Sequence, residues 1–524
     1  MADPSTQSSA PNQISERILN ILAAPESGSQ KLQRGIEKES LRVNLQGELS
    51  RQTHPETLGS PLTHPEITTD FSEAQLELIT DVHDNPQACL TQLTNIHQFV
   101  HQGIDQELLW PSSMPCLVGN DEDIPLGQYG TSHIGRAKTI YRHGLGVRYG
   151  RLMQTISGIH YNFSLPTELW QALGIHSQDD VTDAYFGLIR NFRRWSWLLL
   201  YLFGASPAVC RSFTKNIQHQ LTEIDEGSQY LPHATSLRMG PLGYQSNAQS
   251  ALHISYNSLG EYARSMQSAL TTDYQPYANH GVLLDGHYQQ LNTAILQIEN
   301  EFYGTIRPKR TIRTGERPIN ALRERGVEYV EVRCMDLNPF VPIGIDAQTI
   351  RFLDVFLITC LVAQSQPDSK LEIARLQANQ LAVVERGRDP DLVLQLNESE
   401  EISLRRWAID LMSQCRQVAQ ALDQANNTTT YRDTTDIQTQ KINDPELTPS
   451  AQVLKQMREE KIPFFRFSMN KAVEHAEYFA RTPLSPDQLA DMRQVAEHSF
   501  TAQKEIEAAD TRPFEEFLEE YLSL

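Results

Sequence analysis

Acidic side chains interrupt several segments whose residues otherwise alternate as they do in β-strands. In QRGIEKESLRVN, residues 33–44, Glu37 and Glu39 share a strand face with Leu41 and Val43, because alternate side chains of a strand point the same way. Carboxylates on such a face are out of place unless something cationic lies over them. The alternative is a polar face that lies outside, with Leu41 and Val43 marking the strand end. For this segment alone, both interpretations stand.

Three further strand-like segments add charged or polar side chains to one face. Residues 68–80, 154–164 and 326–336 contribute Asp70, Glu77, His160, Glu331 and Arg333. Two carboxylates about 4 Å apart repel by about 4 kcal/mol at an effective dielectric constant near 20, so a cluster would raise its own pKa values unless cations neutralised it. Carboxylates with one imidazole suit Mg²⁺ or Mn²⁺ better than zinc, and Mg²⁺ bound in this way usually accompanies substrate phosphates.

A basic run lies inside an otherwise acidic chain. The chain has 45 Lys and Arg against 65 Asp and Glu, a net charge of −20, and the run comprises Arg307, Lys309, Arg310, Arg313 and Arg317. Alone, such a run is typical of a solvated face; opposite a carboxylate–metal cluster it could instead bind polyphosphate through arginine forks. The overall acidity argues against nucleic acid or an anionic membrane as the main partner.

Several common motifs are missing from the sequence. There is no GxxxxGK[ST] loop, and residues 144–150 miss the GxGxxG spacing by one residue and precede a strand-like segment, which disfavours both of these nucleotide-binding folds. His97 and His101 have a metal-compatible spacing on a predicted helix, but no third ligand is near in sequence. An exposed helix face is therefore the favoured interpretation for this pair.

The cysteines and the apolar runs indicate in which cellular compartment the protein is expected. The chain has 6 cysteines and no CxxC pair among them. This pattern predicts reduced, mostly buried thiols in a cytoplasmic protein. The cysteines are Cys89, Cys116, Cys210, Cys334, Cys360 and Cys415. The longest apolar runs, at 197–203 and around 355–358, fall far short of the roughly 20 residues of a membrane helix. The polar N-terminal segment also lacks the basic start of a signal sequence.

Hydrophobic periodicity divides the chain into a strand-rich part and a helical part. It predicts helices over residues 14–24, 180–203, 346–363 and 403–424, strands also over 294–300 and 326–333, and a surface loop or linker over 426–446. This order favours an α+β fold with a mainly antiparallel sheet and a helical C-terminal part.

Together these segments resemble the proteobacterial form of glutamate–cysteine ligase (γ-glutamylcysteine synthetase). The resemblance is strong over about residues 30–345 and is carried by QRGIEKESLRVN, LTHPEITTDFSEAQLELIT, LWPSSMPC, QYGTSHIGRAKTIYRHGL, RYGRLMQTISGIHYNFSLP, YLFGASPAVC, LPHATSLRMGPLGY, LQIENEFYGTIRPKR and GVEYVEVRCMDLNPFVPIGID. It implies a glutamine-synthetase-like core whose antiparallel sheet forms a funnel-shaped active site. The implied division is a polar tail and first helix over 1–30, a catalytic core over 31–345, and a mainly helical region over 346–524 packed on the core.

The resemblance also implies a reaction, the first step of glutathione biosynthesis. ATP, L-glutamate and L-cysteine give γ-glutamylcysteine, ADP and phosphate through γ-glutamyl phosphate, with Mg²⁺ or Mn²⁺ bound, in a monomeric enzyme. Phosphorylation supplies the leaving group that a carboxylate lacks, while the protein positions the reactants and neutralises charge. Two alternatives remain: a ligase of this fold that joins glutamate to another amine, and a catalytically silent member that binds ATP or metal. The presence of all the charged residues named below argues against the second.

Residue by residue, the resemblance assigns three groups of side chains. The metal and phosphate face comprises Glu37, Glu39, Asp70, Glu77, His160 and Glu331. The catalytic residues are Arg238, Arg333 and Glu331, and the basic run adds Arg307, Lys309 and Arg310 to Arg333 on the ATP side. The amino-acid substrates are expected to meet Phe71, Tyr141, Leu145, Gln154, Arg238, Tyr244 and Tyr303.

Overall fold

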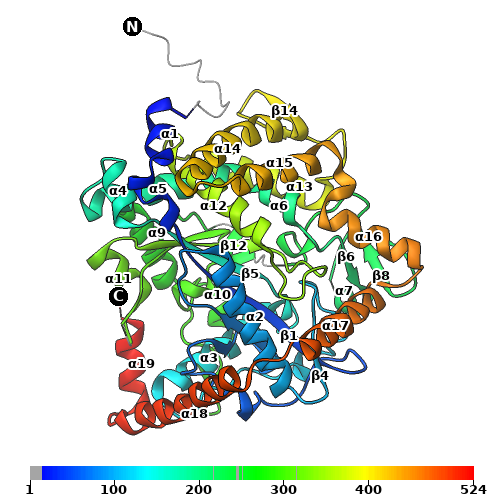
Figure 1. Ribbon diagram of the computed structural model, residues 1–524. Helices are drawn as coiled ribbons and strands as arrows, with labels where there is room; N and C mark the ends of the chain where they lie inside the picture. Colours follow the sequence, from blue (N-terminus) through cyan, green and yellow to red (C-terminus); the bar gives the residue numbers. More distant parts are fainter. Residues whose placement is uncertain (1–13, 216, 244–246, 251, 314, 524) are drawn as a thin grey trace.

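A seven-stranded antiparallel sheet lies at the centre of the molecule (Figure 1). The computed structural model describes residues 14–215, 217–243, 247–250, 252–313 and 315–523. The strand order is β11-β12-β5-β1-β3-β2, and β4 pairs with the C-terminal end of β1. The strands are β1 (Gln33–Asn44), β2 (Ile67–Thr69), β3 (Gln75–Ile79), β4 (Glu107–Leu109), β5 (Ile159–Ser164), β11 (Ile306–Lys309) and β12 (Tyr329–Met335).

The two faces of this sheet have opposite characters, as the alternation in the sequence predicts. Ile36, Leu78, Tyr161, Phe163 and Val332 point to one face and are buried in the main hydrophobic core. The other face carries the acidic side chains. The interpretation of residues 33–44 as a strand with a solvated polar face is wrong, because Glu39, Leu41 and Val43 on that face are all buried.

Helices cover the hydrophobic face of the sheet in two layers. The inner layer contains α2 (Pro86–Gly103), α5 (Gln178–Trp195), α6 (Trp197–Phe203) and α12 (Ala347–Val362). Outside it lie α1 (Glu16–Ala23), α14 (Leu404–Asn426) and α15 (Thr430–Asn443), with α14 and α15 side by side at the top of Figure 1. Residues 180–203 are therefore two helices rather than one, interrupted at Ser196. The predicted α+β fold with a helical C-terminal part is confirmed.

The end of the chain forms a strap that returns to the opposite side of the sheet. From α17 (Phe464–Arg481), α18 (Pro486–Ala509) leads to α19 (Phe514–Leu522), which packs on α3 (His133–Tyr149). Figure 1 shows α18 and α19 at the bottom of the molecule, away from α14 and α15. Phe514 and Leu518 form a small core with Ala137, Leu291 and Ile298, so the strap supports the segments around α3.

The remaining elements are short connections or peripheral pieces. The helices are α4 (Thr167–Ala172), α7 (Arg211–Thr214), α8 (Asn247–Ser250), α9 (Leu259–Thr271), α10 (Gln275–Ala278), α11 (Pro318–Arg325), α13 (Lys370–Arg386) and α16 (Pro449–Glu460). The strands are β6 (Ala208–Cys210), β7 (Thr222–Glu223), β8 (Ser228–Tyr230), β9 (Leu283–Leu284), β10 (His287–Tyr288), β13 (Val393–Gln395) and β14 (Glu401–Ser403).

Three local predictions are wrong. Residues 430–443 form α15 rather than a loop, because the helix packs against α12 and α14 and buries Tyr431, Thr435 and Ile442. Residues 294–300 are not a strand; they end in a single 3₁₀ turn at Glu299–Glu301. His97 is buried rather than on an exposed face, and its ring stacks on Phe479.

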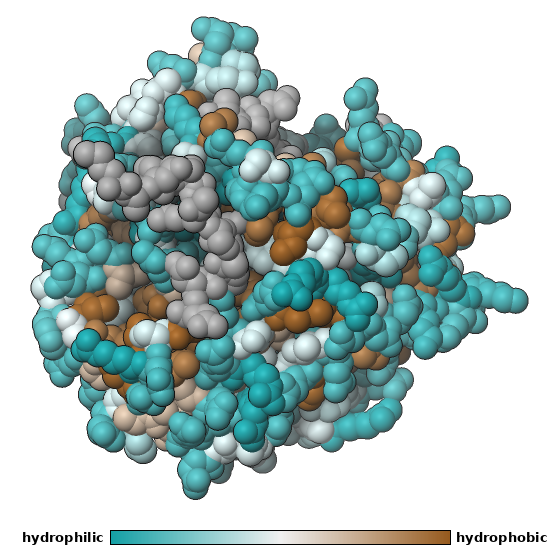
Figure 2. Space-filling model, turned by 90° about the horizontal axis from the view of Figure 1, so that it is seen from above, coloured by the Kyte–Doolittle hydropathy of each residue, from teal (hydrophilic) through white to brown (hydrophobic). Residues whose placement is uncertain are grey.

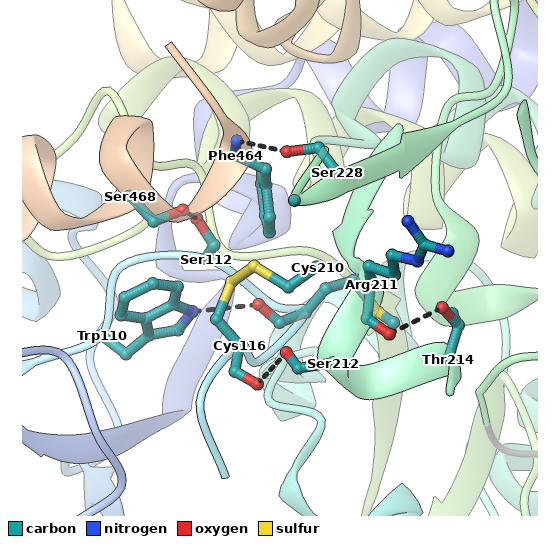
Figure 3. The surroundings of a disulfide bond; sticks show 12 residues. Trp110, Ser112, Cys116, Cys210, Arg211, Ser212, Thr214, Ser228, Phe464 and Ser468 are labelled. Carbon is teal, nitrogen blue, oxygen red and sulfur yellow. Dashed lines mark hydrogen bonds between the residues drawn. A yellow bond between two sulfur atoms is a disulfide. The ribbon is translucent and has the colours of Figure 1, made fainter. Parts of the chain in front are cut away.

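The cysteine prediction is wrong for one pair. Cys116 and Cys210 form a disulfide that joins the loop after β4 to the end of β6 (Figure 3). Ser212 donates a hydrogen bond to the Cys116 carbonyl at 2.9 Å. The pair is 94 residues apart in sequence, so no local spacing revealed it. Cys89, Cys334, Cys360 and Cys415 are buried thiols, and the cytoplasmic location stays a prediction that now depends on these four.

Polar side chains dominate the visible surface. In the view of Figure 2, hydrophilic residues cover most of the face, and apolar side chains appear as separate patches between them. Among the described residues, every helix is too short or too polar to cross a bilayer.

Candidate active site

Strand pairing brings the predicted metal ligands together on the polar face of the sheet. The β1–β5 register places Glu37 opposite His160, and the β1–β3 register places Glu39 opposite Glu77. The imidazole Nδ1 of His160 lies 3.1 Å from a Glu37 oxygen, and its Nε2 lies 3.6 Å from Glu39. Asn162, next but one on β5, donates to the other Glu37 oxygen at 2.8 Å. Side chains from three neighbouring strands thus converge.

This cluster has the donor set of a divalent-cation site. One oxygen each of Glu37 and Glu77 and one nitrogen of His160 lie within 4.8 Å of one another. Burial, followed by the charges of Glu37 and Asp70, raises the pKa of Glu77 well above its ordinary value. Burial and Asp70 likewise raise the pKa of Glu39 to about 8. A bound cation would favour the ionised carboxylates and relieve this repulsion, so the residues fit one.

His160 is in the form that a metal requires. Burial and the positive charge of Arg333 lower the pKa of the imidazole, so the neutral ring with a free lone pair is favoured. Asp70 lies in the turn between β2 and β3, and its backbone carbonyl accepts a hydrogen bond from the Arg142 guanidinium on α3. Arg142 therefore holds this turn toward the cluster.

Cationic side chains adjoin the cluster at Glu331 on β12. Lys309 donates to one oxygen of Glu331 at 3.0 Å, and Arg333 donates to the other at 3.1 Å. Although burial opposes ionisation, these two charges hold the pKa of Glu331 well below its ordinary value. Arg333 Nη1 also lies 3.5 Å from His160 Nδ1, which connects the cationic side chains to the carboxylates.

The basic run divides according to strand face. Arg307 and Lys309 share the polar face through β11, and Arg307 donates to the carbonyls of Asn300, at 2.9 Å, and Phe302. Arg310 follows the strand and donates instead to the carbonyl of Arg325 at 2.8 Å. Arg307 and Lys309 therefore lie on the polar face and Arg310 lies beside it, and the binding of polyphosphate by this run stays a prediction.

Arg238 lies against the same sheet face, and its guanidinium occupies space beside Gly158 that a side chain there would fill. A Cβ on Gly158 would come within 1.9 Å of Arg238 Nη2. The Gly158 amide donates to Glu39 at 2.7 Å, and Arg238 donates to the carbonyl of Arg333 at 3.1 Å. Gly158 was not among the residues expected at the site, although its position just before a polar strand could have indicated it.

Asp336 is a second site residue that the sequence analysis missed. Its carboxylate lies 3.9 Å from Arg238 Nη1 and accepts hydrogen bonds from Ser206 at 2.6 Å and Ser236 at 2.8 Å. These bonds join the end of β12 to the two loops that flank Arg238. The signal in the sequence is an acidic residue three positions after the predicted strand 326–333.

Most of the predicted amino-acid pocket also comes together. Phe71 and Leu145 are buried in one hydrophobic cluster with Tyr141 beside them, and the Gln154 amide donates to the Tyr303 hydroxyl at 3.0 Å. Tyr244 lies outside the described residues. A cavity of about 390 Å³ is lined by Tyr303, Arg238 and Arg333, whereas Phe71, Tyr141, Leu145 and Gln154 are not among its lining residues.

Comparisons with known proteins agree with this geometry. The family model for glutamate–cysteine ligase matches residues 19–383. A glutamate–cysteine ligase from Alcanivorax borkumensis is 47% identical over 501 residues, covering 94% of this chain and 95% of the relative. The enzyme of that name from Pseudomonas putida is 47% identical over 516 residues, covering 97% and 98%.

Solved structures lead to the same family. The crystal structure of a glutamate–cysteine ligase from Francisella tularensis, in complex with AMP, superposes with a TM-score of 0.88 at 37% identity, covering 94% of this chain and 97% of that one. A bifunctional glutathione synthetase from Pasteurella multocida, at 24% identity and a TM-score of 0.68, shares the fold. This chain, with its carboxylates and cations converging on one face of an antiparallel sheet, belongs to the glutamate–cysteine ligase family.

Proposed function

We propose that this chain ligates the γ-carboxylate of L-glutamate to the amine of L-cysteine at the expense of ATP, the first step of glutathione biosynthesis. The observation that carries the proposal is one buried sheet face on which Glu37, Glu77 and His160 adjoin Glu331, Lys309 and Arg333. A carboxylate cluster beside fixed cations suits the binding and transfer of a phosphoryl group.

Glu37, Glu77 and His160 would hold a divalent cation, with Glu39, Asp70 and Glu331 around it. Mg²⁺ suits this set, with Mn²⁺ as an alternative, because the donors are carboxylates and a single imidazole. When bound, the cation supplies positive charge that neutralises phosphate oxygens. His160 remains neutral and Glu331 ionised, and both states suit this role.

The ATP side of the site is proposed to be the end of the sheet at β11. Lys309 and Arg333 approach Glu331 from opposite sides, so a phosphate chain can lie along them with its terminal group at Arg333. The AMP in the Francisella tularensis structure supports a nucleotide site in this fold. Arg307 is proposed to help through the loop carbonyls that it holds, and Arg310 to contribute at the sheet edge.

The amino-acid substrates are proposed to occupy the cavity that reaches Arg238, Tyr303 and Arg333. The glutamate γ-carboxylate attacks the terminal phosphorus of ATP, and ADP leaves with the bridging oxygen. The cysteine amine then attacks the acyl carbon, and phosphate leaves. Arg238 would orient the glutamate, and Arg333 would stabilise the transferred phosphoryl group.

The cysteine side chain is proposed to lie near Phe71, Tyr141 and Leu145, with Gln154 and Tyr303 at the polar end. An aromatic-walled pocket of this kind suits a short thiol side chain, because it excludes water around a small apolar group. We also propose that Tyr244 belongs to this pocket, as the resemblance implies.

ADP release from the purified protein tests this proposal. With Mg-ATP and glutamate, release should depend on cysteine, and mass spectrometry should find γ-glutamylcysteine. Release with another amine but not with cysteine would change the assigned acceptor while keeping the chemistry. ATP binding without release under any acceptor would contradict the proposal.

A further inference from the structure

A buried carboxylate outside the metal cluster lies behind the proposed acceptor pocket. The Glu301 and Arg148 side chains are both fully buried and form an ion pair at 2.8 Å. The Tyr149 hydroxyl donates to the same Glu301 oxygen at 2.6 Å, and the backbone amide of Gln297 donates to the other oxygen at 2.6 Å. Such a pair needs every partner, because removing one leaves a buried charge or polar group unsatisfied.

This group is joined directly to Tyr303. The Gln249 amide donates to the Glu301 carbonyl at 2.8 Å and to the Tyr149 hydroxyl at 3.2 Å, and its oxygen accepts from the Tyr303 backbone amide at 3.1 Å. The rings of Tyr149 and Tyr303 meet edge to face, with centroids 5.9 Å apart. The backbone and the ring of Tyr303 are thus both fixed from the Glu301 side.

The same group also fixes α3, which carries Tyr141. The Gln297 side chain donates to the Tyr141 carbonyl at 3.2 Å and accepts from the Leu291 amide at 2.9 Å. Gly144 makes this approach possible, since a Cβ there would come within 2.2 Å of the Gln297 side-chain oxygen. One buried carboxylate therefore connects the two walls of the pocket.

We propose that Glu301 is a positioning residue, which acts through Tyr149 and Gln249 to fix Tyr303 and Tyr141 and so sets the affinity for the acceptor amino acid. The inference rests on the proposed function. A pocket for a side chain as small as that of cysteine tolerates little movement of its walls, because site geometry must hold within about 0.5 Å. None of the hydrogen bonds and ring contacts described above joins this network to Glu331 or Arg333, so its effect should be confined to the acceptor.

The chain contains a matched control for this arrangement. On the opposite face of the sheet, the Tyr161 hydroxyl donates to Asp354 at 2.6 Å, and Arg34 pairs with Asp354 at 3.1 Å. This is again a buried arginine, carboxylate and tyrosine, but it packs in the hydrophobic core. Tyr161→Phe removes the same kind of hydrogen bond as Tyr149→Phe.

Steady-state kinetics of the full-length Tyr149→Phe and Tyr161→Phe variants test the inference. We expect Tyr149→Phe to raise the KM for cysteine about 10-fold while the KM for ATP changes less than 2-fold, and Tyr161→Phe to change both less than 2-fold. Hydroxylamine provides a second readout: it captures the acyl phosphate without filling a side-chain pocket, so its rate with Tyr149→Phe should stay within 2-fold of wild type. Glu301→Gln should show the same pattern more strongly if it folds.

Three outcomes would overturn the inference. The first is an unchanged cysteine KM in Tyr149→Phe, and the second is an equal loss with cysteine and with hydroxylamine. The third is an equal rise in cysteine KM in Tyr161→Phe, which would indicate a general effect of weakened packing. If the wild-type protein shows no turnover with any of the acceptors, the proposed function and this inference are both overturned. If the wild type is active and the Tyr149→Phe variant has normal kinetics, only the inference is overturned.

Discussion

Buried carboxylates lie on both faces of the central sheet, but their partners differ. On the hydrophobic face, Asp354 accepts from Tyr161 with one oxygen and pairs with Arg34 through the other. On the polar face, Glu37, Glu39 and Glu77 crowd one another, and burial together with neighbouring carboxylates raises the pKa of Glu39 and Glu77.

This difference separates a structural charge from a functional one. A buried ion pair whose oxygens are all matched contributes to one packed arrangement and needs nothing from outside. A cluster whose carboxylates crowd one another raises its own pKa values and favours a cation from solvent. The following predictions compare the two faces, beginning with the largest expected effect.

Glu331→Gln should abolish turnover while leaving the fold intact. We expect kcat to fall by about 10³-fold, because the change removes the charge that brings Lys309 and Arg333 together at the phosphoryl site. Thermal unfolding should shift by only a few degrees, since both cations keep Glu37 as a neighbour. Near-normal activity at low Mg²⁺ would contradict this role for Glu331.

Asp354→Asn should show the opposite pattern. Removing the charge leaves Arg34 buried without its ionic partner, which should lower the free energy of unfolding by about 3 kcal/mol. The kcat of the folded variant should remain within 2-fold of wild type. Urea unfolding and kinetics on the same sample measure both quantities; loss of activity in a fully folded variant would remove the distinction between the faces.

Gly158→Ala should displace Arg238 from the polar face. The new Cβ would lie 1.9 Å from the guanidinium, and the expected result is a fall of about 10²-fold in kcat/KM for glutamate. Gly187→Ala is the matched control, because a Cβ there, on α5, meets its nearest atom at 3.7 Å. If both variants had wild-type kinetics, the proposed role of Arg238 would be wrong.

The contribution of Glu39 to the stability of the metal-free protein should fall as the pH rises from 6 to 8, while buried histidines such as His54, His64 and His97 act in the opposite direction. The pKa of Glu39 is raised from 4.5 to about 8 in the folded chain, so its contribution is fully present below about 4.5 and is lost as the pH passes 8. We expect a loss of about 2 kcal/mol over this interval. Mg²⁺ should reverse the loss by binding the ionised form.

Thermal unfolding at both pH values, in EDTA and in Mg²⁺, measures this effect. Relative to wild type, Glu39→Gln should gain about 2 kcal/mol of stability between pH 6 and 8, whereas Asp354→Asn should keep the slope of the wild type. A slope unchanged in Glu39→Gln would show that another group on the polar face is responsible.

The sheet and most of its polar face could be predicted from the sequence. Strand alternation at 33–44, 159–164 and 329–335 is local, and it correctly placed Glu37 and Glu39 on one face and Tyr161 on the other. The helix at 430–443 could not be predicted in the same way, because it buries threonines rather than an apolar stripe. The break at Ser196 was hidden because no Gly or Pro accompanies it in the sequence.

The resemblance and the structure also differ in what they supply. The resemblance named Tyr141, Gln154 and Tyr303 as pocket residues, and the structure brings these three together. It did not indicate Gly158, Asp336 or Glu301, whose importance lies in contacts with residues distant in sequence. The monomeric state and the division of the chain at residues 30 and 345 stay predictions.

The sequence by itself determined which side chains share a strand face, since that depends only on alternation along each strand. It also determined that the polar face would carry several carboxylates. Only the tertiary structure decided that Glu39 faces Glu77, that Glu37 faces His160, and that Cys116 meets Cys210. The physical reason is that register, ion pairing and disulfide geometry arise from contacts between segments far apart in the chain, and no local periodicity encodes which segments will meet.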